Sequence, residues 1–173
     1  IGINQKHIAR EDQFASDLAL IAANRIFDSN VIKREDIDYL IYCTQSPDYY
    51  LPTTACVLQD RLGLLTTIGA IDINMGCSGY LYGLSFAKGL IESGQAENVL
   101  FITADTYSKY INSGDRSVKP LFGDGAAATI LSQCKGSSGL QSFVFGTDGK
   151  GMNNLIVPAG GLRNPSSKEN MQE

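Results

Sequence analysis

The sequence predicts an α/β fold in which a mostly parallel mixed sheet is covered by helices on both faces. Short apolar runs of strand length alternate along the chain with stretches of helical period. The first three of these runs also lack the polar/apolar alternation of a half-exposed strand, which is typical of strands buried on both faces. With 43% hydrophobic and 18% charged residues among 173, the composition suits one globular unit and excludes a disordered chain.

The first part of the chain predicts a helix, a strand and a second helix. Apolar residues recur at spacings of three and four over 12–27, which predicts an amphipathic helix. Residues 39–43 form a run of strand length, and the loop 46–52 that follows is bracketed by prolines. Thr53 or Thr54 can cap a second helix that ends at about residue 62, where a glycine follows.

The alternation continues to about residue 145. Further strands are expected at 68–73, 98–103, 126–131 and 140–145. A helix is expected over 78–93; it is apolar nearly all round, so we expect it to be buried on all sides. Glycine, proline, serine and asparagine dominate the end of the chain, so residues 159–173 are expected to form a loop or a frayed end.

Charge and apolar run length exclude several classes of partner. The chain has 14 Lys and Arg against 18 Asp and Glu, a net charge of −4, and no basic cluster, which argues against a nucleic-acid or anionic-membrane surface. Its apolar runs are much shorter than the roughly 18 residues that a membrane span needs. The chain begins without methionine or a signal-peptide pattern, so we interpret it as a piece of a longer protein.

Cysteine spacing argues against a metal site. No two of the four cysteines form a CxxC pair, and the single histidine cannot complete a cysteine-rich zinc site. We therefore expect no bound metal and reduced thiols, as in a cytoplasmic protein.

The most informative segment, residues 72–90, reads DINMGCSGYLYGLSFAKGL. A predicted strand runs into a glycine turn that places Cys77 at the entrance of the predicted helix, where unpaired N–H groups and the helix dipole stabilise a thiolate. Gly76, Gly79 and Gly83 allow close approach of backbone or ligand. We predict that Cys77 is a nucleophile at the floor of a narrow pocket; the alternative is a buried structural cysteine.

Two familiar nucleophile arrangements do not fit this segment. An α/β-hydrolase elbow needs a small residue two positions before the nucleophile, where Met75 stands. A cysteine–histidine dyad needs a histidine, and His7 lies in a polar N-terminal segment where we expect a surface residue. If Cys77 is catalytic, its acid/base partners therefore lie outside this chain.

Two other features have a structural and a functional interpretation. Gly123-Asp124-Gly125 resembles a phosphate-cradling loop but lacks either full motif, so we favour a turn that enters a strand. Tyr107 and Tyr110 could face a pocket, but tyrosines at this spacing near a helix usually pack.

Four segments of the sequence resemble those of a known family. NMGCSGYLYGLSFA resembles the active-site segment of the thiolase superfamily, specifically its β-ketoacyl-acyl-carrier-protein synthase III branch. DRSVKPLFGDGAAA resembles a second signature of that branch, SPDYYLPTTACVLQDRLGL its dimer loop and following helix, and ADTYSKY the end of the next strand. The resemblance covers residues 3–158. Members of the family are about twice as long and consist of two similar halves, so 1–158 resembles the N-terminal half-domain without its first strand, and 159–173 leads to an absent C-terminal half.

The resemblance implies an acyltransferase that starts fatty acid biosynthesis. Cys77 takes an acyl group from an acyl-CoA as a thioester, and a decarboxylative Claisen condensation with malonyl-acyl carrier protein follows. The backbone N–H of Cys77 supplies half of an oxyanion hole. The catalytic His and Asn of the family lie in the absent half, so this fragment alone is expected to be inactive. The resemblance also implies a cytoplasmic homodimer that needs no cofactor beyond its CoA thioester substrate.

Four further positions match substrate-contacting positions of the family. Arg116 matches a contact to CoA, although a solvated loop arginine is an equal alternative. Leu121 and Phe122 match pocket-wall positions, and Leu51 matches the residue that reaches across the dimer to close the acyl tunnel. Relatives often carry Phe at the Leu51 position. The smaller Leu leaves the chain length of the acyl primer undetermined.

Other functions remain compatible with the sequence. Within the superfamily they are alkylquinolone, aryl-polyene and chalcone-synthase-like ketosynthases and a 3-hydroxy-3-methylglutaryl-CoA synthase-like enzyme. From another class, the chain could be a non-catalytic dimer scaffold in which Cys77 is inert.

Overall fold

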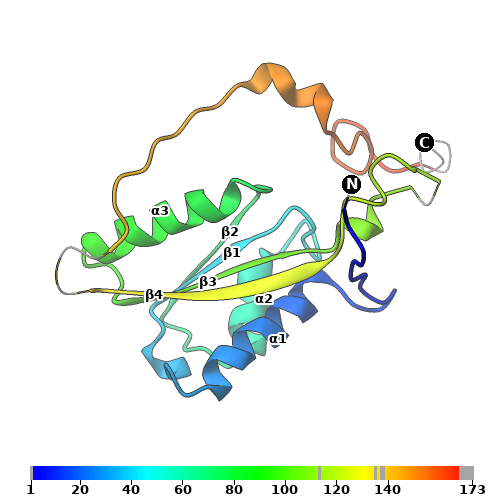
Figure 1. Ribbon diagram of the computed structural model, residues 1–173. Helices are drawn as coiled ribbons and strands as arrows, with labels where there is room; N and C mark the ends of the chain where they lie inside the picture. The colour runs from blue at the N-terminus through cyan, green and yellow to red at the C-terminus, as the bar shows by residue number, and fades with distance from the viewer. Residues whose placement is uncertain (1, 113, 135, 137–138, 168–173) are drawn as a thin grey trace.

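A four-stranded sheet forms the centre of the computed structural model, which describes residues 2–112, 114–134, 136 and 139–167 (Figure 1). The strands are β1 (Tyr39–Cys43), β2 (Gly69–Ile73), β3 (Asn98–Asp105) and β4 (Gly125–Ser132). Their order is β2-β1-β3-β4; β1 pairs parallel with both β2 and β3, while β4 runs antiparallel to β3. The prediction of a mostly parallel mixed sheet is therefore confirmed.

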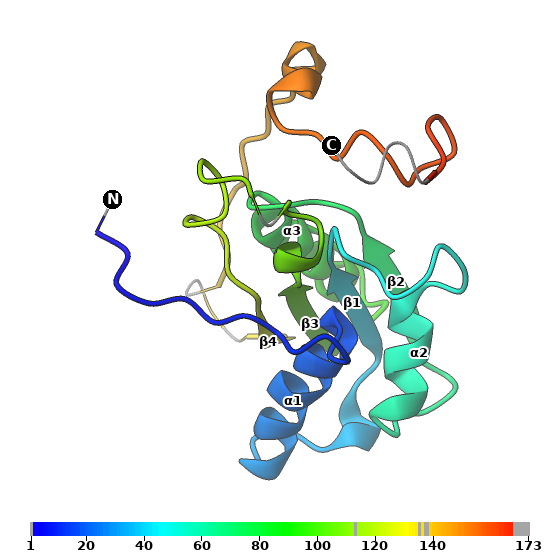
Figure 2. The same ribbon diagram turned by 90° about the vertical axis from the view of Figure 1, so that its right-hand side faces the viewer.

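Helices cover both faces of this sheet, as predicted. The α-helices are α1 (Ala15–Asp28), α2 (Thr54–Arg61) and α3 (Gly79–Glu92), and the short 3-10 helices are η1 (Arg34–Asp36), η2 (Tyr107–Lys109) and η3 (Gly149–Asn154). Figures 1 and 2 show α1 and α2 on one face and α3 on the other. Along β1, Leu40 and Tyr42 belong to the cluster under α1 and α2, whereas Ile41 and Cys43 belong to the cluster under α3. Burial on both faces explains why β1 reads as a continuous apolar run.

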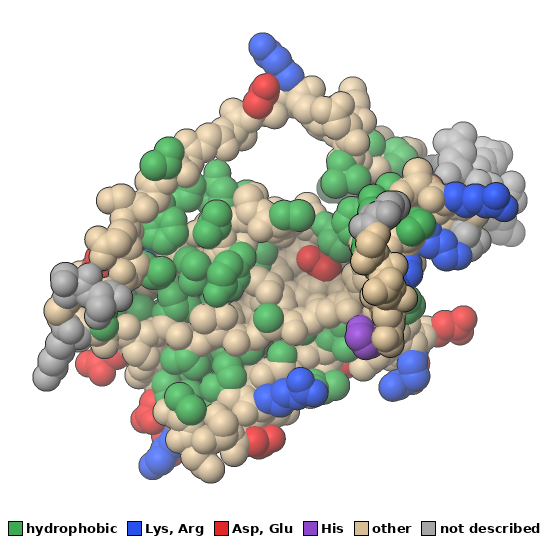
Figure 3. Space-filling model, viewed as in Figure 1, with side chains coloured by type: hydrophobic (Ala, Val, Ile, Leu, Met, Phe, Trp, Pro, Cys, Tyr) green, Lys and Arg blue, Asp and Glu red, His purple; other side chains and the backbone are tan. Residues whose placement is uncertain are grey.

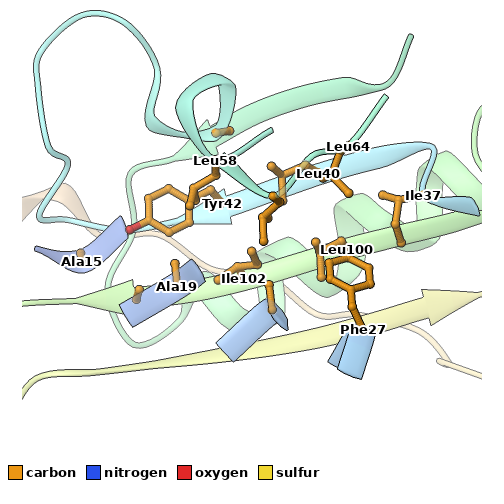
Figure 4. Packing of buried hydrophobic residues seen from close by; sticks show 14 residues of the cluster. Ala15, Ala19, Phe27, Ile37, Leu40, Tyr42, Leu58, Leu64, Leu100 and Ile102 are labelled. Atoms are coloured by element: carbon orange, nitrogen blue, oxygen red, sulfur yellow. The ribbon is translucent and has the colours of Figure 1, made fainter. Parts of the chain in front are cut away.

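The larger core lies between the sheet and the helices α1 and α2 (Figure 4). Tyr42, Leu58 and Leu100 are fully buried there. The face that α1 turns to the sheet carries Ala15, Ala19 and Ala23, whose small side chains let the helix approach closely. This packing fixes the strand ends from which the candidate site is built.

Thr53 is the N-cap residue of α2, as predicted, but its side chain makes no capping hydrogen bond. Instead, the Asp72 carboxylate at the end of β2 accepts the Thr54 N–H at 2.8 Å and the Ala55 N–H at 2.7 Å. The predicted glycine stop is present, since Gly63 follows the helix with a φ of +65°.

The predicted strand at 140–145 is also wrong. The segment is extended but pairs with no described strand, and Val144 is 98% exposed. It forms the first part of an arm, residues 140–155, which passes over α3 and includes η3 (Figure 1). At the start of this arm the Phe145 ring lies 4.8 Å from the Tyr82 ring of α3. Residues 159–167 form a loop with one isolated bridge between Gly161 and Asn164, and the rest of the predicted chain end, 168–173, lies outside the described residues.

Helix α3 is buried along one stripe only, so the predicted burial of this helix holds for only part of its surface. Gly79, Gly83, Ala87 and Leu90 are buried against the sheet. The opposite stripe is open, with Leu81 56% exposed, because the described residues supply no second layer above it. Figure 3 shows hydrophobic side chains gathered on this side of the sheet.

Candidate active site

Three loops meet at the edge of the sheet where the parallel strands β1, β2 and β3 end. Gln45, Cys77 and Tyr107 each follow one of these strands within a few residues. Carboxyl ends of parallel strands lie at one edge of a sheet, and ligands of α/β proteins bind there. The topology therefore brings together three side chains that are far apart in the sequence.

Cys77 lies on the loop between β2 and α3, as predicted. It is a free, exposed thiol directly before Ser78, the N-cap of α3. A tight turn holds it there, since the Gly79 N–H donates to the Gly76 carbonyl at 2.8 Å. The thiol therefore stands at a helix N-terminus, where an anion is stabilised. The predicted narrow pocket is not formed by the described residues, which leave Cys77 open to solvent.

The glycines around Cys77 have two different roles. A Cβ on Gly79 would lie 2.4 Å from Cys43 Sγ, and one on Gly83 would lie 2.1 Å from the Phe101 ring, so both glycines let α3 pack on the sheet. A Cβ on Gly76 would instead lie 2.8 Å from Gln45 Oε1. Only Gly76 therefore borders the candidate site.

Gln45, which sequence reasoning missed, is held at three points. Its N–H donates to Asp105 Oδ1 at 2.7 Å, and its carbonyl accepts the Tyr110 hydroxyl at 3.2 Å. Its side-chain Oε1 accepts a short hydrogen bond from the Tyr107 hydroxyl. Its only sequence signal is its position just after a strand that turns out to be central in the sheet.

Tyr107 both packs and faces the site, so the expectation of packing describes only half of its role. Its ring lies against that of Phe122, with 5.3 Å between centroids. Burial, and then the charges of Asp105 and Cys77, raise the pKa of Tyr107 to about 12, so its hydroxyl is protonated at neutral pH and donates to Gln45. Through this contact the predicted wall residue Phe122 lies beside the site.

Asp105 ties the end of β3 to the loop after β1. Its Oδ1 accepts three hydrogen bonds, from Thr44 Oγ1 at 3.2 Å, the Gln45 N–H at 2.7 Å and Ser46 Oγ at 3.1 Å. Burial raises the pKa of this carboxyl, although the same hydrogen bonds oppose the rise. The partly buried Asp105 carboxylate therefore fixes the loop that carries Gln45.

The other predicted substrate residues lie apart from Cys77 in the described chain. Leu51 is 85% exposed, and Leu121 is 48% exposed. Arg116 is exposed on a turn that Asp115 stabilises by accepting the Ser117 N–H at 2.8 Å. No described hydrogen bond or ring contact links Leu51, Leu121 or Arg116 to Cys77.

The Gly123-Asp124-Gly125 segment is an anchor at the start of β4. The Asp124 carboxylate accepts the Ala9 N–H at 2.8 Å and the Ser108 N–H at 3.0 Å, which joins the N-terminal segment to η2. His7 is exposed, and its carbonyl accepts the Asp124 N–H at 2.8 Å. These contacts match the structural interpretation of the segment.

The described residues contain neither a cluster of metal ligands nor a membrane-spanning helix. No group of three or more His, Cys, Asp and Glu side chains within the described ranges could hold a metal ion. No helix in the same part of the chain is long and apolar enough to cross a membrane.

The fold and the Cys77 turn define the class of thiolase-like proteins. Within that class, the sequence model of 3-oxoacyl-[acyl-carrier-protein] synthase III matches residues 71–149. β-Ketoacyl-[acyl-carrier-protein] synthase III of Caldanaerobacter subterraneus subsp. tengcongensis is 42% identical over 172 residues, which are 99% of this chain and 52% of that protein.

Solved structures give the same result. A crystal structure of a 3-oxoacyl-(acyl-carrier-protein) synthase III superposes with a TM-score of 0.92 at 53% identity, covering 96% of this chain and 50% of that one. A 3-oxoacyl-(acyl-carrier protein) synthase of Burkholderia xenovorans LB400 gives 0.88 at 39% identity, covering 99% and 49%. The chain is therefore similar to 3-oxoacyl-[acyl-carrier-protein] synthases III over nearly its whole length, and it spans about half the length of the curated relatives it matches.

Proposed function

We propose that this chain is the nucleophile-bearing, N-terminal half of a condensing enzyme that starts fatty acid biosynthesis. The enzyme joins an acyl-CoA primer to malonyl-acyl carrier protein. The observation that carries the proposal is the placement of Cys77, an accessible thiol at the N-terminus of α3, where the loops after three parallel strands meet. The high identity to synthases III over nearly the whole chain supports it.

In the first step the Cys77 thiolate attacks the acyl carbon of the primer. A carbon–sulfur bond forms to Cys77 and the bond from that carbon to the CoA sulfur breaks. The electron pair leaves on the CoA sulfur, which takes up the proton that the thiol gave up. The backbone N–H of Cys77 stabilises the oxyanion of the tetrahedral intermediate.

In the second step the bond between the malonyl carboxylate and its neighbouring carbon breaks and releases CO₂. The freed electron pair forms the new carbon–carbon bond to the acyl carbon, and Cys77 leaves as a thiolate. In our proposal a His and an Asn of the C-terminal half stabilise the enolate, so residues 1–173 alone do not turn over.

The remaining residues bind substrate in this scheme. Phe122, beside Tyr107, and Leu121 form the wall of the acyl pocket. Arg116, exposed on its turn, contacts CoA. Leu51, at the tip of its loop, reaches into the pocket of a second subunit.

Exposed apolar side chains support a larger assembly. Leu81 on α3 is 56% exposed, and Val144 and Leu155 on the arm are 98% and 73% exposed. Folded monomers rarely leave large contiguous apolar patches to water. We propose that the C-terminal half covers α3 and the arm, and that the enzyme is a cytoplasmic homodimer.

The test is a condensation assay on the full-length protein with an acyl-CoA and malonyl-acyl carrier protein. We expect 3-oxoacyl-acyl carrier protein from the wild type and from Cys56→Ala, a matched control because Cys56 is also exposed but lies on α2. We expect no product from Cys77→Ala. An active Cys77→Ala variant would overturn the proposal. So would a wild type that makes no product and whose Cys77 is alkylated no faster than Cys56, as a non-catalytic scaffold requires.

A further inference from the structure

Three buried side-chain atoms of the described residues make no hydrogen bond, and none of them has a role in the scheme above. They are the Tyr42 hydroxyl, Asp48 Oδ1 and Thr54 Oγ1. Tyr42 and Thr54 are 0% and 1% exposed. Buried polar atoms of folded proteins almost always have a partner, either in the chain or in a bound water. We propose that these three atoms form a buried water site, which ties the loop after β1 to the starts of α1 and α2.

Tyr42 and Thr54 meet at the start of α2. Tyr42 lies directly beside Asp72 in the register of β1 and β2, and Asp72 accepts the Thr54 N–H at 2.8 Å. Thr54 Oγ1 approaches the same carboxylate, but without the geometry of a hydrogen bond. The Tyr42 hydroxyl likewise approaches Thr44 without such a bond. The chain therefore leaves both hydroxyls to another partner.

Asp48 reaches the same place from the start of α1. Figure 4 shows the Tyr42 hydroxyl pointing toward Ala15, the first residue of α1. The next residue of that helix, Ser16, donates its hydroxyl to Asp48 Oδ2 at 2.6 Å. Burial raises the pKa of both Tyr42 and Asp72, and the charge of Asp48 adds to the rise in each case, so the carboxylate lies near both groups.

Water fits the chemistry of this site. A carboxylate oxygen only accepts hydrogen bonds, whereas a hydroxyl both donates and accepts, and a buried water serves two to four such partners. A bound cation is not needed to balance Asp48. Its second oxygen is bonded to Ser16, and Ser16 Oγ also accepts a hydrogen bond from Arg61 at 2.9 Å, which brings a guanidinium close to the carboxylate.

The site gives the loop 46–52 a second attachment. The tip of this loop is exposed, with Tyr50 at 80% and Leu51 at 85%. At its base, the Asp48 side chain holds the loop to α1 through Ser16. A water between Asp48 Oδ1 and the Tyr42 hydroxyl also holds it to the central strand β1, so the loop opens less often.

The test is Tyr42→Phe in the full-length protein, because this change keeps the ring in the core and removes only the hydroxyl. The variant leaves the water and Asp48 Oδ1 without one partner, so we expect its melting temperature to fall by about 2 °C. Amide hydrogen exchange of residues 48–51 should become about tenfold faster, since the loop loses one attachment.

The sign of the melting shift separates the alternatives. A hydroxyl buried without any partner costs stability, so its removal would raise the melting temperature. A rise, or no change in either readout, would overturn the inference. The control is Tyr39→Phe, on the same strand but with its ring against Phe86 on the opposite face, and it should leave exchange of 48–51 unchanged.

A crystal structure of the full-length protein tests the ligand itself. It should show a water within hydrogen-bond distance of the Tyr42 hydroxyl and Asp48 Oδ1. A direct hydrogen bond between these two atoms, or a metal ion in place of the water, would overturn the inference.

Discussion

Gly83 sets how closely α3 lies on the sheet, and its replacement by alanine tests that packing. A Cβ at this position would lie 2.1 Å from Cζ of Phe101 and 2.6 Å from Cε1 and Cε2, whereas ordinary contact begins at 3.4 Å. The helix and the ring must therefore separate by about 1.3 Å. Phe101 has little room to move, since it is 1% exposed and stacks with Tyr80 at 5.5 Å.

The expected free-energy change follows from two opposing effects. Overpacking a well-filled core costs about 1–3 kcal/mol, while alanine in place of glycine in a helix returns up to about 1 kcal/mol. We expect Gly83→Ala to lower the free energy of unfolding by about 1–2 kcal/mol, measured by urea denaturation.

The matched control is on the same helix. Gly89 is exposed, and a Cβ there would meet no atom within 4 Å, so Gly89→Ala should raise the free energy of unfolding by about 0.5–1 kcal/mol. A Gly83→Ala protein as stable as the wild type, or equal effects of the two substitutions, would refute the packing argument.

Two partly buried carboxylates, those of Asp72 and Asp105, lead to contrasting predictions. Because the two oxygens of Asp72 accept from Thr54 and Ala55 separately, Asp72→Asn leaves one helix N–H unpaired and should cost about 1–2 kcal/mol of unfolding free energy in urea. Asp105→Asn keeps an oxygen that can accept all three hydrogen bonds of Asp105 Oδ1, so it should change the pH dependence of stability instead. Burial raises the pKa of Asp105 above 3.8, so the folded protein binds this proton more tightly than the unfolded chain. Wild-type stability should therefore fall as pH rises from about 3.8 through that pKa, and the variant should lack this part of the fall. If the urea midpoints of the wild type and of Asp105→Asn depend on pH in the same way, Asp105 does not cause this fall in stability.

Local patterns in the sequence were enough to predict most of the sheet. Residues 39–43 form strand β1, as predicted. A strand buried on both faces can be recognised from its own continuous apolar run, without knowing which strands lie beside it. The strand predicted at 140–145 failed for the opposite reason. β-propensity describes a residue that fits a pleated surface, but a strand needs a partner, and the described chain offers none to this segment.

Long-range contacts account for the details that the sequence could not reveal. Thr53 is the N-cap residue of α2, as its type predicts, but the carboxylate of Asp72 at the end of β2, not the Thr53 side chain, accepts the first N–H groups of the helix. The position of Cys77 directly before α3 could be predicted, because neighbouring residues form the glycine turn that places it. The place of Gln45 in the candidate site could not be predicted, because no motif marks this residue. It lies at the site because β1 is placed between β2 and β3 in the sheet.

The most direct test of Cys77 as the nucleophile is to trap the acyl group on the protein. Full-length protein is incubated with acetyl-CoA without malonyl-acyl carrier protein, quenched in acid and digested, and its cysteine-containing peptides are analysed by mass spectrometry. We expect one acetyl group on the Cys77 peptide, none on those of Cys43, Cys56 or Cys134, and none on any peptide of Cys77→Ala. Acetylation at another cysteine would contradict this role of Cys77, and so would the absence of an acetyl group on Cys77 in a protein that makes condensation product once malonyl-acyl carrier protein is added.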